Sequence, residues 1–250
     1  MTEEPYRWLE AIANRREYVR DQLKDGSPVF AVSLAEGILL LGVGAGQSKV
    51  FELFDRQALA GLGHPADLEK IRQAAIDAAH VEAFTRAPED VSLRRLIGFG
   101  LSPQLKMNFE QIFSAPFLVE LLLAELGNEP GQDLLFRLHF DGGFQVQSGG
   151  VLMAASQPEA ESAGQKWLKE SLRGVTSRAD IVDLLLQAWW CQVRNKWLAD
   201  PLPDAAQRQA GWREETRGKV VEIGWLARSG PRPARYQTLT LPGLGLPSVP

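Results

Sequence analysis

The chain has 250 residues, of which 45% are apolar, and this length and composition can bury a sizeable core in a single domain. Its formal net charge of -4 gives no basic field of the kind that attracts phosphates, so nucleic acid is not expected as a partner. Cys191 is the only cysteine, which excludes an intrachain disulfide and favours a reducing compartment.

Targeting and membrane segments are also not expected. Residues 1–21 are charged throughout and lack the apolar centre of a signal peptide. The apolar stretch at 117–126 is too short to cross a bilayer and contains Glu120 and Glu125. We therefore expect a cytoplasmic protein with no membrane partner.

The first predicted element is a helix, because apolar residues recur at intervals of three and four between Pro5 and the Asp25-Gly26 turn. Four short strands are predicted to follow it, at 29–34, 38–41, 49–55 and 58–63. Gly37 lies in the tight connection between the first two strands and can take a positive φ, which predicts a hairpin there.

Helical periodicity returns at 65–86 and at 91–113, where Pro103 is expected to introduce a kink. A second pair of helices is predicted further along, at 158–172 and 178–198. Strands are predicted in the remaining apolar segments, at 117–127, 133–141, 144–155, 219–228 and 235–241.

Two polar or glycine-rich segments are predicted to lie outside these elements. Residues 200–218 show no clear period and are predicted to form a surface loop. Residues 241–250 are rich in Gly and Pro and are predicted to form a flexible tail. Together the segments indicate one α+β domain over 1–250, with an N-terminal helix within 1–24. Two antiparallel sheets pack face to face, and helices cover the outer side of each.

Ser27 raises a functional question because it follows Gly26 and directly precedes an apolar strand. A serine in this position could be a hidden nucleophile, whose own amine becomes the base once the preceding chain is cut away. It could equally be the first residue of the strand.

The order of features in the first 150 residues resembles the proteasome α-type subunits, and the bacterial forms most closely. Landmarks shared with that family, from about Tyr6 to Gly150, are the helix before the first strand, Lys24-x-Gly26, the turn at Glu36-Gly37, "KVFELFDR", Gly63-x-x-x-Asp67 and Asp141-Gly142. The resemblance implies the four-layer αββα fold of the amino-terminal-nucleophile hydrolases and membership of a ring of like subunits.

The same resemblance implies a role in intracellular protein degradation. An α-type subunit is non-catalytic, forms a homo-oligomeric ring that caps and gates a β-type protease ring, and docks an activator or ATPase ring. The N-terminal helix would form the contact between neighbouring subunits, through Tyr6, Leu9, Ile12 and Ala13.

Ser27 can be compared with the nucleophile of the β-type subunits, because it stands nine residues before Glu36, at the position of their catalytic threonine. Two differences from that pattern count against catalysis. Val43 or Gly44 stands where the β-type subunits carry an aspartate, and Pro28 follows Ser27 directly. We therefore expect no catalytic residue, with two alternatives kept: a self-processed hydrolase that uses Ser27 and Lys49, and a free-standing ring or scaffold without a protease partner.

Lys49 matches the lysine that, in α-type subunits, lines the pocket where the C-terminal carboxylate of an activator docks. The resemblance implies the same role here, with Gly26 and Glu17 near the rest of that pocket. A lysine in contact with a carboxylate makes a charge-assisted hydrogen bond. The alternative is a solvated lysine that precedes an amphipathic strand.

Other candidate residues are interpreted as structural. The three histidines, His64, His80 and His139, lack the spacing of a metal site, and no metal or other cofactor is expected. Ser156 is interpreted as a helix cap, and Trp189 as a core or interface residue.

Overall fold

A computed structural model of the protein describes residues 5–230 and 235–247. The first part of the chain forms a helix, four strands and a group of helical segments: α1 (Pro5–Leu23), β1 (Val29–Leu34), β2 (Gly37–Gly44), β3 (Val50–Phe54), β4 (Gln57–Gly63), α2 (Pro65–Thr85), η1 (Pro88–Asp90), α3 (Leu93–Arg95), η2 (Leu96–Leu101) and α4 (Ser102–Glu110).

The second part of the chain adds six strands and three long helices: β5 (Val119–Glu125), η3 (Pro130–Gln132), β6 (Leu134–His139), β7 (Phe144–Ser148), β8 (Val151–Ala154), α5 (Pro158–Ser171), α6 (Arg178–Val193), α7 (Ala205–Glu215), β9 (Val220–Ala227), β10 (Tyr236–Leu239) and η4 (Pro242–Leu244). None of the helices in the described part of the chain combines the length and the apolar character that a bilayer span requires.

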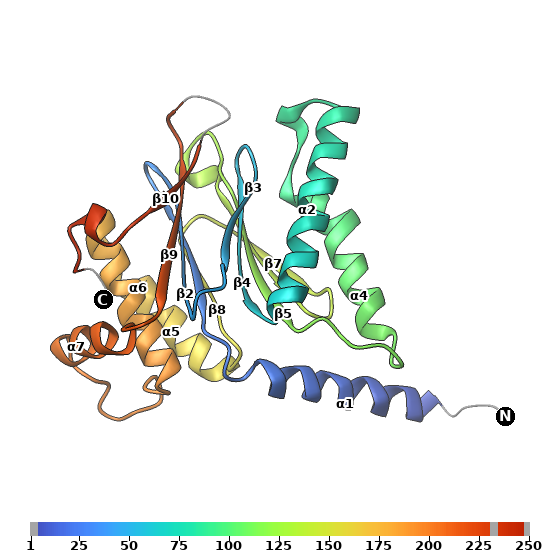
Figure 1. The fold of residues 1–250 in the computed structure, drawn as a ribbon, viewed down its shortest axis with the longest axis horizontal. Helices are drawn as coiled ribbons and strands as arrows, with labels where there is room; N and C mark the ends of the chain where they lie inside the picture. The colour runs from blue at the N-terminus through green and yellow to red at the C-terminus, as the bar shows by residue number, and fades with distance from the viewer. Residues whose placement is uncertain (1–4, 231–234, 248–250) are drawn as a thin grey trace.

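The strands form two five-stranded antiparallel sheets. Sheet A has the order β10-β9-β2-β1-β8, and sheet B the order β3-β4-β5-β6-β7. Figure 1 shows the sheets face to face, with α5, α6 and α7 outside sheet A and α2 and α4 outside sheet B. The predicted four-layer αββα fold is therefore confirmed.

Three apolar clusters fill the spaces between these layers. One lies between the sheets and includes Ala31, Leu40 and Leu122, and the other two lie between each sheet and its helices. β2 contributes to both sides of sheet A, since all eight of its residues are buried. A strand buried on both faces has a continuous apolar sequence, as "GILLLGVG" shows.

The predicted first hairpin is present, with Leu34 opposite Gly37. Gly37 has a φ of 159°, and a Cβ added there would lie 2.1 Å from the carbonyl oxygen of Leu226. The close approach of β9 therefore requires glycine at this turn.

The prediction of one strand over 144–155 was wrong, because β7 belongs to sheet B and β8 belongs to sheet A. Between them lie Gly149 and Gly150, with φ values of 59° and 75°. Two successive residues in the left-handed region turn the chain from one sheet to the other. This connection joins the two sheets covalently at one edge of the sandwich.

The loop predicted over 200–218 was also wrong, since it contains helix α7. Asp204 caps this helix by accepting from the backbone N–H of Gln207, whose side chain accepts from the Asp204 backbone in return. Such a capping box stabilises a helix without an apolar period. The only fully buried apolar side chain of α7 is that of Trp212.

The helices around Pro103 and at 178–198 also differ from the predictions. The helical segment expected at 91–113 contains a π-helical turn over 96–101, which directly precedes α4, where Pro103 lies in the first turn. The backbone at Leu101 and Ser102 is helical and the Ser102 N–H donates to the Ile97 carbonyl, so the wider turn adjoins a proline inside a continuous helical run. The helix predicted to reach residue 198 ends at Val193.

Part of the predicted tail packs on the protein. Leu241 is buried, and Leu244 and Leu246 contact the core outside sheet A. Residues 248–250 lie outside the described residues.

Candidate functional site

Ser27 lies between α1 and β1, and its hydroxyl contacts groups from two other elements. Ser27 Oγ donates to the carbonyl oxygen of Val43 at 2.6 Å and accepts from the indole N–H of Trp189 at 2.9 Å. Neither a backbone carbonyl nor an indole N–H can act as a general base for the hydroxyl. In the intact chain, the backbone nitrogen of Ser27 is an amide and not an amine. These contacts anchor the start of β1 and do not activate the serine.

Lys49 directly precedes β3, and its side chain contacts the backbone of Ser27. Its Nζ donates to the carbonyl oxygen of Ser27 at 3.4 Å. The backbone N–H groups of Lys49 and Val50 donate to the carboxylate of Glu222 on β9, at 3.0 and 3.2 Å. Burial lowers the pKa of Lys49, and the charge of Glu222 opposes this effect. Glu222 thus fixes the backbone that carries the lysine.

Ser27, Lys49 and Gly26 line one pocket of about 560 Å³, which we call the Lys49 pocket. Lys219 also lines it but pairs with Glu215 at 2.6 Å, whereas Lys49 makes no ion pair with any described residue. A Cβ on Gly26 would lie 2.8 Å from the carbonyl oxygen of Leu23. A half-buried ammonium without an anionic partner suits a carboxylate ligand.

Helix α1 is the second candidate functional feature, because it carries exposed apolar residues. Figure 1 shows it running out from the sandwich beyond α4. Its C-terminal end is anchored by buried Val19 and Leu23, which join the core between the sheets. Further toward the N-terminus, Trp8 and Leu9 are 49% and 63% exposed. The middle of the helix is held by Arg15 and Arg16, which bond to Asn108 and Asp141, so the exposed apolar residues at its N-terminal end are a candidate surface for a partner.

Comparisons with known proteins identify the family. No protein-family model matches the chain. The chain is 31% identical over 188 residues to the proteasome subunit alpha of Paenarthrobacter aurescens, an alignment that covers 68% of this chain and 77% of that protein. It is 32% identical over 187 residues to that of Renibacterium salmoninarum, with 72% of each chain covered. The chain belongs to the proteasome alpha-subunit family.

A third relative, the proteasome subunit alpha of Streptomyces griseus, is 24% identical over 236 residues, which is 92% of this chain and 78% of that protein. The likeness to proteasome alpha subunits therefore extends beyond residue 150, where the landmarks in the sequence end. The predicted resemblance to bacterial proteasome α-type subunits is confirmed.

In this proteasome alpha-family chain, the structure brings together three of the four residues that the sequence singled out for this site. Ser27, Lys49 and Gly26 share a pocket, and Glu17 is not among the residues that line it. On α1, Leu9 and Ala13 are exposed, while Ile12 packs partly against the core of its own chain. The side chain of Tyr6 lies outside the described part of the structure.

Sequence reasoning missed two residues of the Lys49 pocket region. Trp189 was interpreted only as an apolar residue, although its indole N–H binds Ser27. Glu222 was not singled out, although it is the one acidic residue within the strand "VVEIGWLA". An acidic residue among apolar neighbours in a strand is the signal that could have revealed it.

The helix-cap interpretation of Ser156 was wrong. The N-cap position of α5 is Gln157, whose side chain makes no capping hydrogen bond, and Ser156 Oγ donates to the carbonyl oxygen of Lys24 at 2.8 Å. The histidines contact separate elements: His64 caps α2, His80 contacts the Ile76 carbonyl, and His139 contacts Glu120. Within the described residues, no cluster of three His, Cys, Asp or Glu has the arrangement of a metal site.

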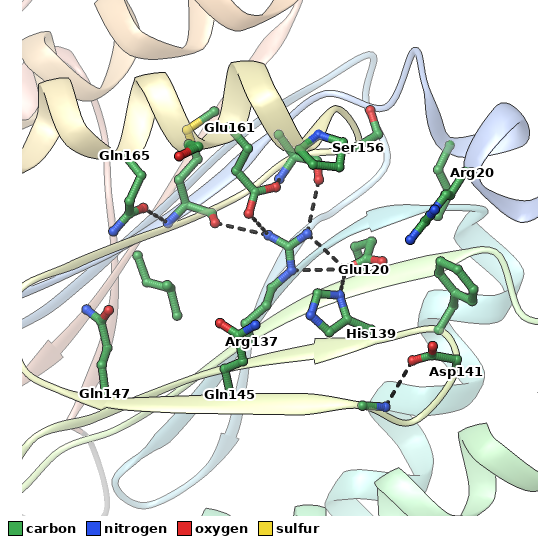
Figure 2. Close-up of a pocket in the computed structure, with 18 of the residues that line it drawn as sticks. Arg20, Glu120, Arg137, His139, Asp141, Gln145, Gln147, Ser156, Glu161 and Gln165 are labelled. Carbon is green, nitrogen blue, oxygen red and sulfur yellow. Dashed lines mark hydrogen bonds and ion pairs between the residues drawn. The ribbon is translucent and has the colours of Figure 1, made fainter. Parts of the chain in front are cut away.

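A second pocket, of about 570 Å³, lies between α5, β8, β6 and β7, and we call it the Arg137 pocket (Figure 2). Arg137 is almost fully buried in its floor and forms ion pairs of 2.9 Å with Glu120 and with Glu161. His139 Nδ1 lies 2.9 Å from the Glu120 carboxylate. Burial raises the pKa of Glu161, while the charge of Arg137 opposes this effect.

Proposed function

We propose that this chain is a non-catalytic subunit that assembles with further copies into a ring, and that the ring caps a β-type protease ring and gates the admission of substrates. Membership of the proteasome alpha-subunit family supports the proteasome part of this role. The observation that carries the assembly part is helix α1, which runs out from the sandwich (Figure 1) and carries the exposed Trp8 and Leu9. A neighbouring copy is the partner that would bury them.

We further propose that Lys49 receives the C-terminal carboxylate of an activator or ATPase ring, in a crevice between two copies, with Gly26 lining the same pocket. Support comes from the half-buried ammonium of Lys49, which makes no ion pair with a described residue and lies in a pocket open to a ligand. In the intact chain the Nζ of Lys49 approaches the backbone carbonyl of Ser27 and not its hydroxyl, which supports a non-catalytic role for this lysine.

Two alternatives remain as outcomes of one experiment. Affinity purification of the native complex, followed by electron microscopy and intact mass measurement, distinguishes them. Stacked rings with a second kind of chain support the proposal. Rings of this chain alone indicate a free-standing scaffold, and a chain that has lost residues 1–26 indicates a self-processed hydrolase that uses Ser27.

A further inference from the structure

The edge of sheet A that β8 forms is closed by side chains, as Figure 2 shows. On β8, the backbone N–H of Met153 donates to Gln165, and that of Ala155 donates to Glu161, both at 2.8 Å. The guanidinium of Arg137 donates to the carbonyl oxygens of the same two residues at 3.0 Å. Side chains from α5 and β6 thus take the place of another strand beside β8, and this edge cannot accept one.

The neighbouring edge of sheet B is formed by β7, and it lacks such a cap. The carbonyl of Gly143 accepts from His139, and the N–H of Gly149 donates to Asp133, so odd-numbered residues of this segment face β6. Because backbone groups alternate along a strand, those of Phe144, Val146 and Ser148 point to the free side. Within the described residues, none of these three backbones hydrogen-bonds outside the β6–β7 ladder.

The sequence of β7, "FQVQS", contains none of the features that usually block an exposed edge. It has no charged residue and no proline, and its pairing with β6 is regular. The opposite edge of sheet B differs, since β3 contains Glu52 and an irregular register beside it. Open, regular edges of this kind accept an extended peptide as an added strand.

The two faces of β7 determine which side chains such a peptide would carry. Gln145 and Gln147 line the Arg137 pocket. On the opposite face, Phe144 and Val146 are 41% and 39% exposed. An added strand continues both faces, because its side chains alternate in the same way. Apolar side chains therefore suit one face of the peptide and polar ones suit the other.

The charges that line the Arg137 pocket indicate which charge the polar side chains of the peptide should carry. Its carboxylates are already paired: Glu120 and Glu161 with Arg137, and Asp141 with Arg16 at 3.0 Å. The cations at its rim are Arg20 and Lys169, both exposed, and neither forms an ion pair with a described residue. The charges left without a partner at this pocket are therefore positive.

We propose that β7 binds an extended peptide segment of a partner protein as an added strand, with acidic side chains that face the Arg137 pocket and apolar side chains that extend the Phe144–Val146 face. Arg20 and Lys169 contribute the attraction for the acidic side chains, and the free backbone groups of β7 hold the peptide. The ring proposed above is not needed for this interaction.

The test uses a fluorescent peptide, acetyl-Val-Glu-Val-Glu-Val-amide, titrated with the full-length protein and followed by anisotropy. Two derivatives carry N-methyl groups, either on the valines or on the glutamates. In an added strand, the backbone N–H groups of either the valines or the glutamates point toward β7, and those of the other set point away from it. One derivative should therefore bind roughly tenfold more weakly or worse, and the other should bind nearly as well as the parent peptide. Lysine in place of both glutamates should also weaken binding.

Matched protein variants locate the site. Val146→Pro removes a backbone N–H that points to the free side, and should weaken binding by about fivefold or more. Arg20→Gln and Lys169→Gln should each weaken binding of the acidic peptide by roughly two- to fivefold, and should leave the lysine peptide unaffected or better bound. Thermal unfolding checks that each variant is folded. If Val146→Pro does not fold, the two N-methylated peptides still test the proposal on the wild-type protein.

Several results would overturn the proposal. They are the absence of saturable binding, equal binding of the two methylated peptides, and equal affinity of the wild-type protein for the acidic and lysine peptides. A fourth is self-association of the wild-type protein that Val146→Pro abolishes, seen by light scattering, because β7 would then pair with a second copy of this chain.

Discussion

Trp189 on α6 donates its indole N–H to Ser27 Oγ at 2.9 Å, across 162 positions of sequence. The Ser27 hydroxyl in turn donates a hydrogen bond to the carbonyl oxygen of Val43 at 2.6 Å. The hydroxyl therefore links a helix outside sheet A to the ends of β1 and β2. In the intact chain Ser27 is therefore a structural link between three elements.

The first prediction concerns this link. Ser27→Ala should destabilise the protein by about 1–3 kcal/mol, because the indole N–H of Trp189 is left without its acceptor. Denaturant unfolding measures the change. Ser156→Ala is the matched control: it removes a serine bond to a backbone carbonyl but leaves no side-chain donor without a partner, so a smaller change is expected. Equal losses in the two variants would contradict the role assigned to Trp189.

The second prediction concerns the assembly surface on α1. Deletion of residues 1–22 should give monomers or aggregates, because the helix that would contact a neighbour is lost. Leu9→Asp should weaken assembly with less disturbance, since it places a charge on a surface that must be desolvated. Val81 is the control: it is also 63% exposed but lies on α2, and Val81→Asp should leave the assembly of this chain intact. Size-exclusion chromatography with light scattering gives the mass, and rings of unchanged mass after the deletion would refute the prediction.

The third prediction concerns Lys49 and an activator. Lys49→Ala should leave the ring intact and weaken activator binding by about 1.5–3 kcal/mol, the contribution of a charged hydrogen bond. Lys219→Ala is the matched control, since Lys219 lines the same pocket but is paired with Glu215. Calorimetry on the assembled ring measures both affinities. An unchanged affinity of the Lys49 variant would leave this residue as a lysine at the start of a strand.

The pH dependence at Lys49 gives a fourth prediction. Burial lowers its pKa from the usual 10.5, so the folded protein loses this proton at a lower pH than the unfolded chain does. Between the two pKa values the unfolded chain binds more protons, and the free energy of unfolding should therefore rise with pH through that window. Carboxylate binding should fall over the same window. Comparison of the wild-type protein with Lys49→Met, by unfolding at a series of alkaline pH values, isolates the contribution.

The fifth prediction concerns a buried ion pair at the opposite end of β1 from Ser27. Asp133 is fully buried and accepts from Arg228 at 2.7 Å and from Ser33 at 2.6 Å. Asp133→Ala should destabilise the protein by about 3–5 kcal/mol, because the largely enclosed guanidinium of Arg228 loses this carboxylate and keeps only backbone carbonyls as acceptors. Asp21 forms an exposed pair with Lys24, and Asp21→Ala should change stability by at most about 1 kcal/mol. Similar losses in the two variants would contradict this difference.

The sequence by itself determined most of the secondary structure and the layer order. Local periodicity is sufficient where one face of an element is buried, as in α2, and where a strand is apolar throughout, as in β2. It failed at α7, whose helix depends on a capping box and on one buried tryptophan instead of an apolar stripe. It also failed at Gly149-Gly150, because an apolar pattern with period two does not say to which sheet a strand belongs.

The chemistry of the site was decided by the tertiary structure. The sequence singled out Ser27 and Lys49, but it did not predict which groups their side chains and backbone atoms contact. Trp189, Val43 and Glu222 approach them only because α6, β2 and β9 pack at the same end of sheet A. A hydrogen bond has a short range and a strict direction, so which groups it joins depends on the three-dimensional arrangement of the elements. The local sequence can mark Glu222 as unusual but does not name its partner.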